Sequence, residues 1–387
     1  MARIIYALSG QGRGHTSRVM ATSEALRARG HHVVFCCGGT AREILERRGE
    51  RVLPVPALRQ VMEANRFRVG ATVRRNWKRV VCAPRIARRL ARAFAAQRAD
   101  LLITDFEAFS PHAARRIGLP VLSFNHQQVV TETRYQLPMR HWPAAAMTAG
   151  AITAIAPSHP RHVLLTSFFF PELRHPECTT LVPPIIRPAV QELEPERGDH
   201  VLVYFNQTEG TGAVLDALRR VDVPFVAYNF GTPERPERYP NITFKHPSLE
   251  GFLSDLAGSR AVVCTAGFTL ISEGLYLDKP LLVAPNGGIF EQTLNARFLE
   301  KEGLGEAASP GDTLTAGDVR GFLERAPRYA QRLDGFEARG NGAAVACIED
   351  VLRTVGAEAP PETSVAPRPA SSSSSARALA RLHEPSA

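Results

Sequence analysis

The chain has 387 residues, more than a single hydrophobic core usually organises, and this length predicts two domains. Hydrophobic residues make up 44% and charged residues 22%, which excludes a fibrous or largely disordered chain. The net charge of +9 suits nucleic acid, an acidic membrane or an anionic substrate and does not choose among them. The six cysteines show no CxxC pair and no His/Cys ligand spacing, and no apolar run reaches the length of a signal or a membrane span. We therefore expect a cytoplasmic protein without a zinc site or a disulfide framework.

The first half of the chain alternates apolar runs with helical segments. Each apolar run is short and bounded by turn residues, as in strands that are buried on both faces. Such alternation predicts a parallel sheet covered by helices. The expected strands are residues 3–8, 32–36, 51–53, 100–105 and 121–124, and the expected helices are 17–29 and 41–48.

A proline-rich passage at 182–188 divides the chain, because proline continues neither a helix nor a central strand. We expect one domain over 1–185 and a second over 190–352, and we expect the last helix of the second domain to pack back on the first domain. The Pro, Ala and Ser composition from 356 predicts a disordered tail over 356–387. Two doubly wound domains would face each other across a cleft at the carboxyl ends of their strands. The second domain is expected to have a helix near 211–220 and strands at 200–205, 225–228, 242–244, 261–263 and 281–283.

The most informative motif follows the apolar run 261–264. The segment Ala266-Gly267-Phe268-Thr269 would let a helix begin close to a ligand and aim its free N–H groups at a phosphate. Glu273 lies one to two turns into that helix, where a carboxylate can accept hydrogen bonds from the vicinal hydroxyls of a ribose. Glu291-Gln292 adds two polar side chains that suit a sugar ring. These residues predict a nucleotide-sugar site.

The loop Ser9-Gly10-Gln11-Gly12-Arg13-Gly14-His15 joins the first strand to a helix. Its glycines follow GxGxG rather than GxGxxG, and the second strand ends without a ribose-binding acid, so the loop argues against NAD. His15 at a helix N-terminus tends to stay neutral and can accept a proton. Asp105, at the carboxyl end of a central strand, could orient it. The alternatives are a histidine that only caps the loop and a helix N-cap at Asp105.

Two further segments of the second half are candidate ligand contacts. The loop 204–212, which includes Thr208, follows a strand where a phosphate loop is expected, and it is polar but not glycine-rich. Phe244-Lys245 follows another strand and could present backbone groups to a base. A buried phenylalanine and a solvated lysine explain those two residues equally well.

Residues 59–98 carry twelve Lys or Arg against one acid, Glu63. Apolar residues are interleaved with these cations, so the segment predicts a basic amphipathic surface for anionic lipid headgroups or an anionic acceptor. An arginine-rich solvated helix face is the alternative. The interleaved residues are Val69, Val73, Trp77, Val80 and Val81.

Together the two halves resemble the GT-B superfamily of glycosyltransferases, in the branch that contains the peptidoglycan N-acetylglucosaminyltransferase and the UDP-glucuronosyltransferase-like enzymes. The resemblance covers about residues 1–352 and is strongest to a little-characterised prokaryotic subgroup. It implies an α/β GT-B fold with two Rossmann-like doubly wound domains facing across a cleft. The segments that carry it are Ala266-Gly267-Phe268-Thr269 with Glu273, Glu291-Gln292 with Asn295-Ala296, and Gly10-Gln11-Gly12-Arg13-Gly14-His15 with Arg18.

The resemblance also implies residue roles. Gly267, Phe268 and Thr269 would hold the diphosphate, Glu273 the ribose hydroxyls, Glu291 and Gln292 the transferred sugar, and Phe244-Lys245 the uracil through backbone contacts. His15 would be the general base with Asp105 as its partner, and Gly12, Gly14 and Arg18 would belong to the acceptor-side loop.

The implied reaction is an inverting transfer, without metal or cofactor, from a nucleotide sugar, UDP-linked, to a hydroxyl. Lipid-linked, cell-envelope and secondary-metabolite glycans are the acceptor classes that it suggests. The expected partners are the nucleotide sugar, an acceptor and, through residues 59–98, the inner face of an anionic membrane. No nucleic acid is expected. The sequence leaves the identity of the acceptor and the oligomeric state open. Two other functions stay open, a UDP-sugar 2-epimerase and a non-catalytic basic binding protein, although no distinct set of elimination acids favours the epimerase.

Overall fold

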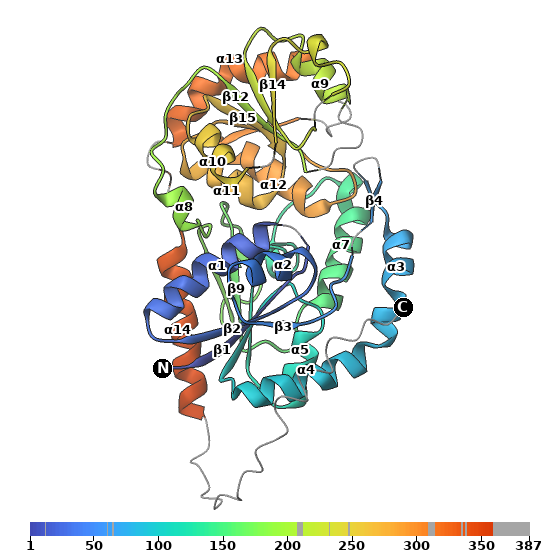
Figure 1. Ribbon diagram of the computed structural model, residues 1–387, viewed down its shortest axis with the longest axis vertical. Helices are drawn as coiled ribbons and strands as arrows, with labels where there is room; N and C mark the ends of the chain where they lie inside the picture. The colour runs from blue at the N-terminus through green and yellow to red at the C-terminus, as the bar shows by residue number, and fades with distance from the viewer. Residues whose placement is uncertain are drawn as a thin grey trace, which may run out of the picture.

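The computed structural model describes residues 1–11, 13–59, 61–63, 66–206, 212–231, 233–246, 248–308, 314–333, 336 and 339–358. Two parallel sheets, each covered by helices, form two halves stacked on one another (Figure 1). The first half carries a seven-stranded sheet and the second a six-stranded sheet. Both halves are Rossmann-like, as the alternating pattern predicts.

The first sheet has the order β11-β9-β7-β6-β1-β2-β3, and all its pairs are parallel. The central strands β6 (Leu101–Asp105) and β7 (Val121–Asn125) are buried along their whole length, which explains why most of their residues are apolar. The strands β9 and β11 were not among the expected strands. The remaining strands are β1 (Arg3–Leu8), β2 (His32–Cys37), β3 (Val52–Pro54), β9 (His162–Thr166) and β11 (Thr179–Val182).

Helices pack on both faces of this sheet (Figure 1). The first helix begins at residue 13, four residues before the expected start, so part of the glycine loop is helical. The last helix, α14, lies against α1 and the β9 and β11 edge. Residues 356–358, expected in the tail, belong to α14, and the rest of the tail lies outside the described residues. These helices are α1 (Arg13–Ala28), α2 (Gly39–Arg47), α3 (Val69–Val81), α4 (Ala83–Gln97), α5 (Ser110–Arg116) and α14 (Asn341–Glu358).

The first half also contains short elements outside its main sheet. Two small antiparallel pairs, β4 with β5 and β8 with β10, lie outside the main sheet. Among the described helices none combines the length and the apolar character needed to cross a bilayer. The short elements and the remaining helices before β12 are β4 (Met62–Glu63), β5 (Arg66–Phe67), α6 (Val129–Glu132), β8 (Thr133–Arg134), η1 (Met139–His141), α7 (Trp142–Ile155), β10 (Glu172–Leu173) and α8 (Pro188–Gln191).

The second sheet has the order β14-β13-β12-β15-β16-β17, again with parallel pairs. Its strands are β12 (Val201–Tyr204), β13 (Phe225–Tyr228), β14 (Ile242–Lys245), β15 (Ala261–Thr265), β16 (Leu281–Ala284) and β17 (Gly305–Ala307). Its helices are α9 (Gly212–Leu218), η2 (Pro236–Arg238), α10 (Leu249–Ala257), α11 (Phe268–Tyr276), α12 (Phe290–Lys301) and α13 (Ala316–Leu333).

The two halves meet through an aromatic contact. Phe169, which follows β9, stacks on Phe298 of α12 with ring centroids 4.0 Å apart. Phe168 stacks on Phe268 at the start of α11, and both pairs are part of one buried cluster that spans the halves. The carboxyl ends of the two sheets are therefore held against each other.

Candidate active site

His15, Arg18 and Asp105 form a cluster where the end of β6 meets the first turns of α1; Arg18 and Asp105 are buried, and His15 is partly exposed. Asp105 is fully buried, and its Oδ1 lies 2.9 Å from Nδ1 of His15. Arg18 stands one turn after His15 on α1 and donates to the same carboxylate from Nε at 3.0 Å and from Nη2 at 2.7 Å. Because the carboxyl end of β6 faces the first turn of α1, residues ninety positions apart meet in one site.

The charge of Arg18 decides the ionisation of Asp105. Burial alone would raise the pKa of the Asp105 carboxyl, but the charges of Arg18 and His15 outweigh burial and hold the pKa below its ordinary value. An ionised Asp105 accepts the Nδ1–H of His15, which leaves Nε2 with the lone pair. Nη2 of Arg18 also lies 3.3 Å from Nδ1, but its bonds to Asp105 are shorter. A histidine oriented in this way by a carboxylate can act as a general base.

Arg18 and Gly14 do not lie on a loop, contrary to the expectation of an acceptor-side loop. Both belong to α1, because the helix begins at Arg13. The Arg18 side chain is only 5% exposed and is turned onto Asp105, so it holds the carboxylate and does not contribute to the protein surface. Gly12, the third residue of that expected loop, lies outside the described residues.

The start of α11 faces the start of α1 across the two halves. Gly267 is the N-cap of α11 and offers no side chain to cap its first N–H groups, which suits an anionic ligand. Thr269, in the first turn, packs so closely on Gly14 that a Cβ at position 14 would overlap its Oγ1. The predicted diphosphate contacts Gly267, Phe268 and Thr269 therefore lie beside the helix end that carries His15.

Gly14→Ala is expected to lower the free energy of unfolding by about 1–3 kcal/mol, because the added methyl group overpacks the contact with Thr269. Urea unfolding would measure the change. Gly70→Ala is the matched control, since position 70 is also helical and has open space around it, and there alanine should be neutral or stabilising. Equal stability of the two variants would contradict the close contact.

Glu273 lies on α11 and is held by a cation from the segment that joins the halves. Its side chain is buried, and its Oε2 accepts a hydrogen bond from Nη2 of Arg187 at 2.7 Å. Burial raises the pKa of the Glu273 carboxyl, and the charge of Arg187 opposes that rise. Arg187 was not predicted, because only the fold brings the residue before α8 to this helix.

The residues predicted for the transferred sugar lie on the first turn of α12. Gln292 is buried, and its Oε1 accepts the backbone N–H of Asn286 at 2.8 Å. The Glu291 side chain is 19% exposed, and its Oε1 lies 3.9 Å from Nε2 of His126. The end of β16 and the start of α12 thus place both side chains at the junction of the halves.

His126 was not predicted from the sequence, although it stands directly after β7 in the same way that Asp105 stands at the end of β6. It is fully buried, with Nδ1 2.8 Å from the carbonyl of Thr166 and Nε2 2.8 Å from Oδ1 of Asn295. Its ring stacks on Phe268 with centroids 3.9 Å apart. Burial lowers the pKa of His126, whereas two acceptor oxygens and Glu291 favour the protonated ring. A polar residue at the carboxyl end of a central strand was the available signal.

The two residues predicted to contact the uracil base, Phe244 and Lys245, have different surroundings. Lys245 ends the edge strand β14, and its Nζ pairs with Asp255 at 2.7 Å, as expected of a partly solvated lysine. Phe244 is half-buried and packs edge-on against Tyr239. Contacts to a base through the backbone of these two residues stay a prediction. Thr208 lies outside the described residues.

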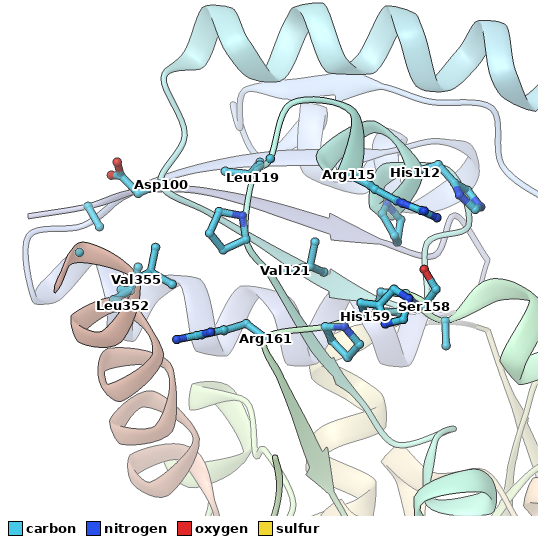
Figure 2. A pocket seen from close by; sticks show the side chains of 18 of the residues that line it. Asp100, His112, Arg115, Leu119, Val121, Ser158, His159, Arg161, Leu352 and Val355 are labelled. Atoms are coloured by element: carbon cyan, nitrogen blue, oxygen red, sulfur yellow. The ribbon is translucent and has the colours of Figure 1, made fainter. Parts of the chain in front are cut away.

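A cavity of about 1190 Å³ lies elsewhere, at the amino ends of the strands of the first sheet. Figure 2 shows Asp100 and Val121 near the strand starts, Arg115 and His112 on α5, and Val355 on α14 around it. None of the predicted site residues lines this cavity. Ligand sites of doubly wound sheets form at the opposite, carboxyl edge, which is where His15, Asp105 and α11 meet.

Comparison with solved structures defines the class of this fold. The glycotransferase of kitacinnamycin is similar with a TM-score of 0.66 and 18% identity, covering 90% of this chain and 98% of that one. MurG of Acinetobacter baumannii (TM-score 0.61, 15% identity, 90% and 100% coverage) and the calicheamicin glycosyltransferase CalG4 (TM-score 0.61, 18% identity, 93% and 100% coverage) are also similar. The two facing Rossmann-like halves are the GT-B glycosyltransferase fold, and the predicted fold class is confirmed.

The chain belongs to the family described as glycosyl transferase family 1, whose model matches residues 2–327. An uncharacterised glycosyltransferase of Methanosarcina acetivorans is 26% identical in an alignment 330 residues long that covers 79% of this chain and 84% of that protein. A second, from Methanosarcina mazei, is 24% identical in an alignment 378 residues long that covers 87% of this chain and 96% of that protein. The protein is a glycosyltransferase, which decides against the epimerase and the non-catalytic binding protein.

Proposed function

We propose that the enzyme transfers a sugar from a UDP-linked donor to an acceptor hydroxyl with inversion of the anomeric centre and without a metal ion. The observation that carries this proposal is the bond between His15 and Asp105 at the helix end that packs, through Gly14 and Thr269, on the first turn of α11. A general base and an anion-binding helix end thereby lie on opposite sides of one junction.

The chemistry follows from these positions. Nε2 of His15 takes the proton of the acceptor hydroxyl, and the oxygen attacks the anomeric carbon on the face opposite the leaving diphosphate. The N–H groups at the start of α11, with Thr269, stabilise the diphosphate as its charge develops, which supports a reaction without a metal. Glu273 binds the ribose hydroxyls, Glu291 and Gln292 bind the sugar, and Phe244-Lys245 contact the base.

A thermal-shift screen of nucleotide sugars tests the donor. UDP-glucose, UDP-glucuronate and UDP-N-acetylglucosamine are compared with the ADP-, GDP- and dTDP-linked sugars. A donor at 100 times its Kd should stabilise the protein by about 2.7 kcal/mol. Stabilisation by a UDP-sugar alone supports the proposal; stabilisation by another nucleotide only, or by none, contradicts it.

Glu273→Gln is expected to weaken binding of the UDP-sugar by about 10–100-fold, because hydrogen bonds to a charged group contribute about 1.5–3 kcal/mol. Calorimetric titration would measure the Kd. Glu324→Gln, on the exposed face of α13 in the same half, is the control and should bind as the wild type does. An unchanged Kd for Glu273→Gln would remove the ribose contact from the proposal.

The proposal also includes the place of the reaction, at an anionic membrane surface that meets residues 59–98. A surface of this kind would bring the enzyme to acceptors held at a membrane. The acceptor site is expected on the first half, beside the loop that leads into α1.

A further inference from the structure

Helix α3 is oriented with polar side chains toward the protein. Asn76 is 5% exposed, and its amide bonds both backbone groups of Arg59, accepting from N at 2.9 Å and donating to O at 2.7 Å. Thr72 Oγ1, one turn earlier, accepts the backbone N–H of Val61 at 2.9 Å. A helix at the surface of a globular protein normally turns its apolar side inward, and this one is fixed by polar contacts instead.

The apolar side chains of α3 consequently face solvent. Val73, Trp77, Val80 and Val81 are 63%, 53%, 61% and 69% exposed. Their spacing of i, i+4, i+7 and i+8 places them along one stripe of the helix. Single exposed apolar residues are ordinary, but a stripe of four on one helix marks a contact surface.

Cations surround this stripe. Between 69 and 98 the chain has nine Lys or Arg and no acid. Helix α4 buries Ala87, Leu90, Ala91 and Phe94, so its arginines, on the other side of the helix, face outward. Within the described part of the chain, no carboxylate forms an ion pair with the α3 cations Arg74, Arg75 and Lys78. A strong positive field thus lies around an exposed tryptophan.

We propose that α3 lies in the interface of an anionic bilayer, with Trp77 and the three valines below the headgroups and the cations of α3 and α4 on the lipid phosphates. A tryptophan and aliphatic side chains flanked by Lys and Arg are the composition of interfacial helices. Nucleic acid would use the cations but leave the valines in water. A second copy would bring two sets of nine cations together, so charge repulsion disfavours self-association.

The bilayer surface is connected to the candidate active site. The segment between β3 and α3 packs on the glycine loop before α1, since a Cβ at Gly10 would overlap Ala57. Two residues later Arg59 is held by Asn76 of α3. This contact deepens the proposed function, which places the reaction at an anionic membrane surface. Binding to the bilayer is measured without donor or acceptor, so it can fail or hold independently of sugar transfer.

Flotation of the full chain with vesicles tests the proposal. Phosphatidylcholine vesicles are compared with phosphatidylcholine mixed with phosphatidylglycerol. One variant removes apolar side chains of α3, Trp77→Ser/Val81→Ser, and the other removes its cations, Arg74→Gln/Arg75→Gln/Lys78→Gln. The controls change exposed side chains at the end of α5: Ile117→Ser for the apolar residues and Arg115→Gln/Arg116→Gln for the cations. Each lost cation should lower partitioning about fivefold, from roughly 1 kcal/mol per charge, and the triple variant about 100-fold.

The expected result is flotation with anionic vesicles only, lost in both variants and kept in both controls. In a Trp142→Phe background, the fluorescence of Trp77 should shift to the blue on adding anionic vesicles. Equal flotation of variants and wild type, absence of flotation, or a dimer in solution that Trp77→Ser/Val81→Ser abolishes would overturn the proposal. Tight binding of RNA or DNA without vesicle binding would also overturn it. Binding of the UDP-sugar is measured separately on the same protein, so a loss of vesicle binding and a loss of donor binding can be told apart.

Discussion

Replacing His15 by alanine is expected to lower kcat/KM for glycosyl transfer by about 10²–10⁴-fold, the usual contribution of a positioned general base. Asp105 binds Nδ1, so Nε2 is the nitrogen that accepts the proton of the acceptor. Affinity for the UDP-sugar should stay within about twofold, because His15 is assigned to the acceptor hydroxyl and the side chains predicted to hold the donor belong to the second half. Release of UDP in the presence of acceptor measures the rate, and calorimetry measures the donor Kd.

The control for this prediction is His112→Ala, an exposed histidine on α5 at the amino edge of the sheet, which should keep full activity. Full activity of His15→Ala would remove the general base from the mechanism. A weaker donor Kd with an unchanged kcat would instead assign His15 to donor binding.

Asp105→Asn is expected to destabilise the protein by about 3–5 kcal/mol at pH 7, because it leaves the buried guanidinium of Arg18 without its charge partner. Urea unfolding is the measurement. The double variant Arg18→Met/Asp105→Asn should be more stable than Asp105→Asn, since it removes both charges. A double variant that is less stable than the single one would contradict the account of this pair.

The same pair predicts a pH dependence. The pKa of Asp105 is lower in the folded protein than in the unfolded chain, so its contribution is fully present above the unfolded pKa of about 3.9. The contribution is lost as the pH falls through the lower, folded pKa. The stability difference between wild type and Asp105→Asn should therefore be large at pH 7 and shrink in strong acid; a difference that grows on acidification would contradict the ion pair.

Much of the fold could be predicted, because its central strands are short and mostly apolar. Strands β1, β6, β7 and β13 lie within one residue of the expected ranges, since burial on both faces marks such runs clearly. The strands β9 and β11 were missed; β11 ends at Val182, where the proline-rich passage at 182–188 that suggested the boundary begins. The early start of α1 was missed because glycines argue for a loop.

The site was predictable where a motif is local and not where it depends on contacts across the molecule. Glu273, Glu291 and Gln292 follow from segments read in order. The bonds of Arg187 to Glu273 and of His126 to Asn295 join residues 86 and 169 positions apart, and no local pattern encodes them. The amphipathic pattern of residues 69–81 was visible, but its outward direction follows from the bonds of Asn76 to Arg59.

Hydrogen exchange of the full chain, with and without a UDP-sugar, is the decisive test of whether the donor binds where α1 and α11 meet. We expect slower exchange in peptides that cover 9–18, 266–273 and 286–296, on both halves of the molecule. Slower exchange confined to the cavity at the amino edge, in peptides covering 111–121 and 349–356, would contradict it (Figure 2). So would the absence of any slower exchange at a saturating donor concentration.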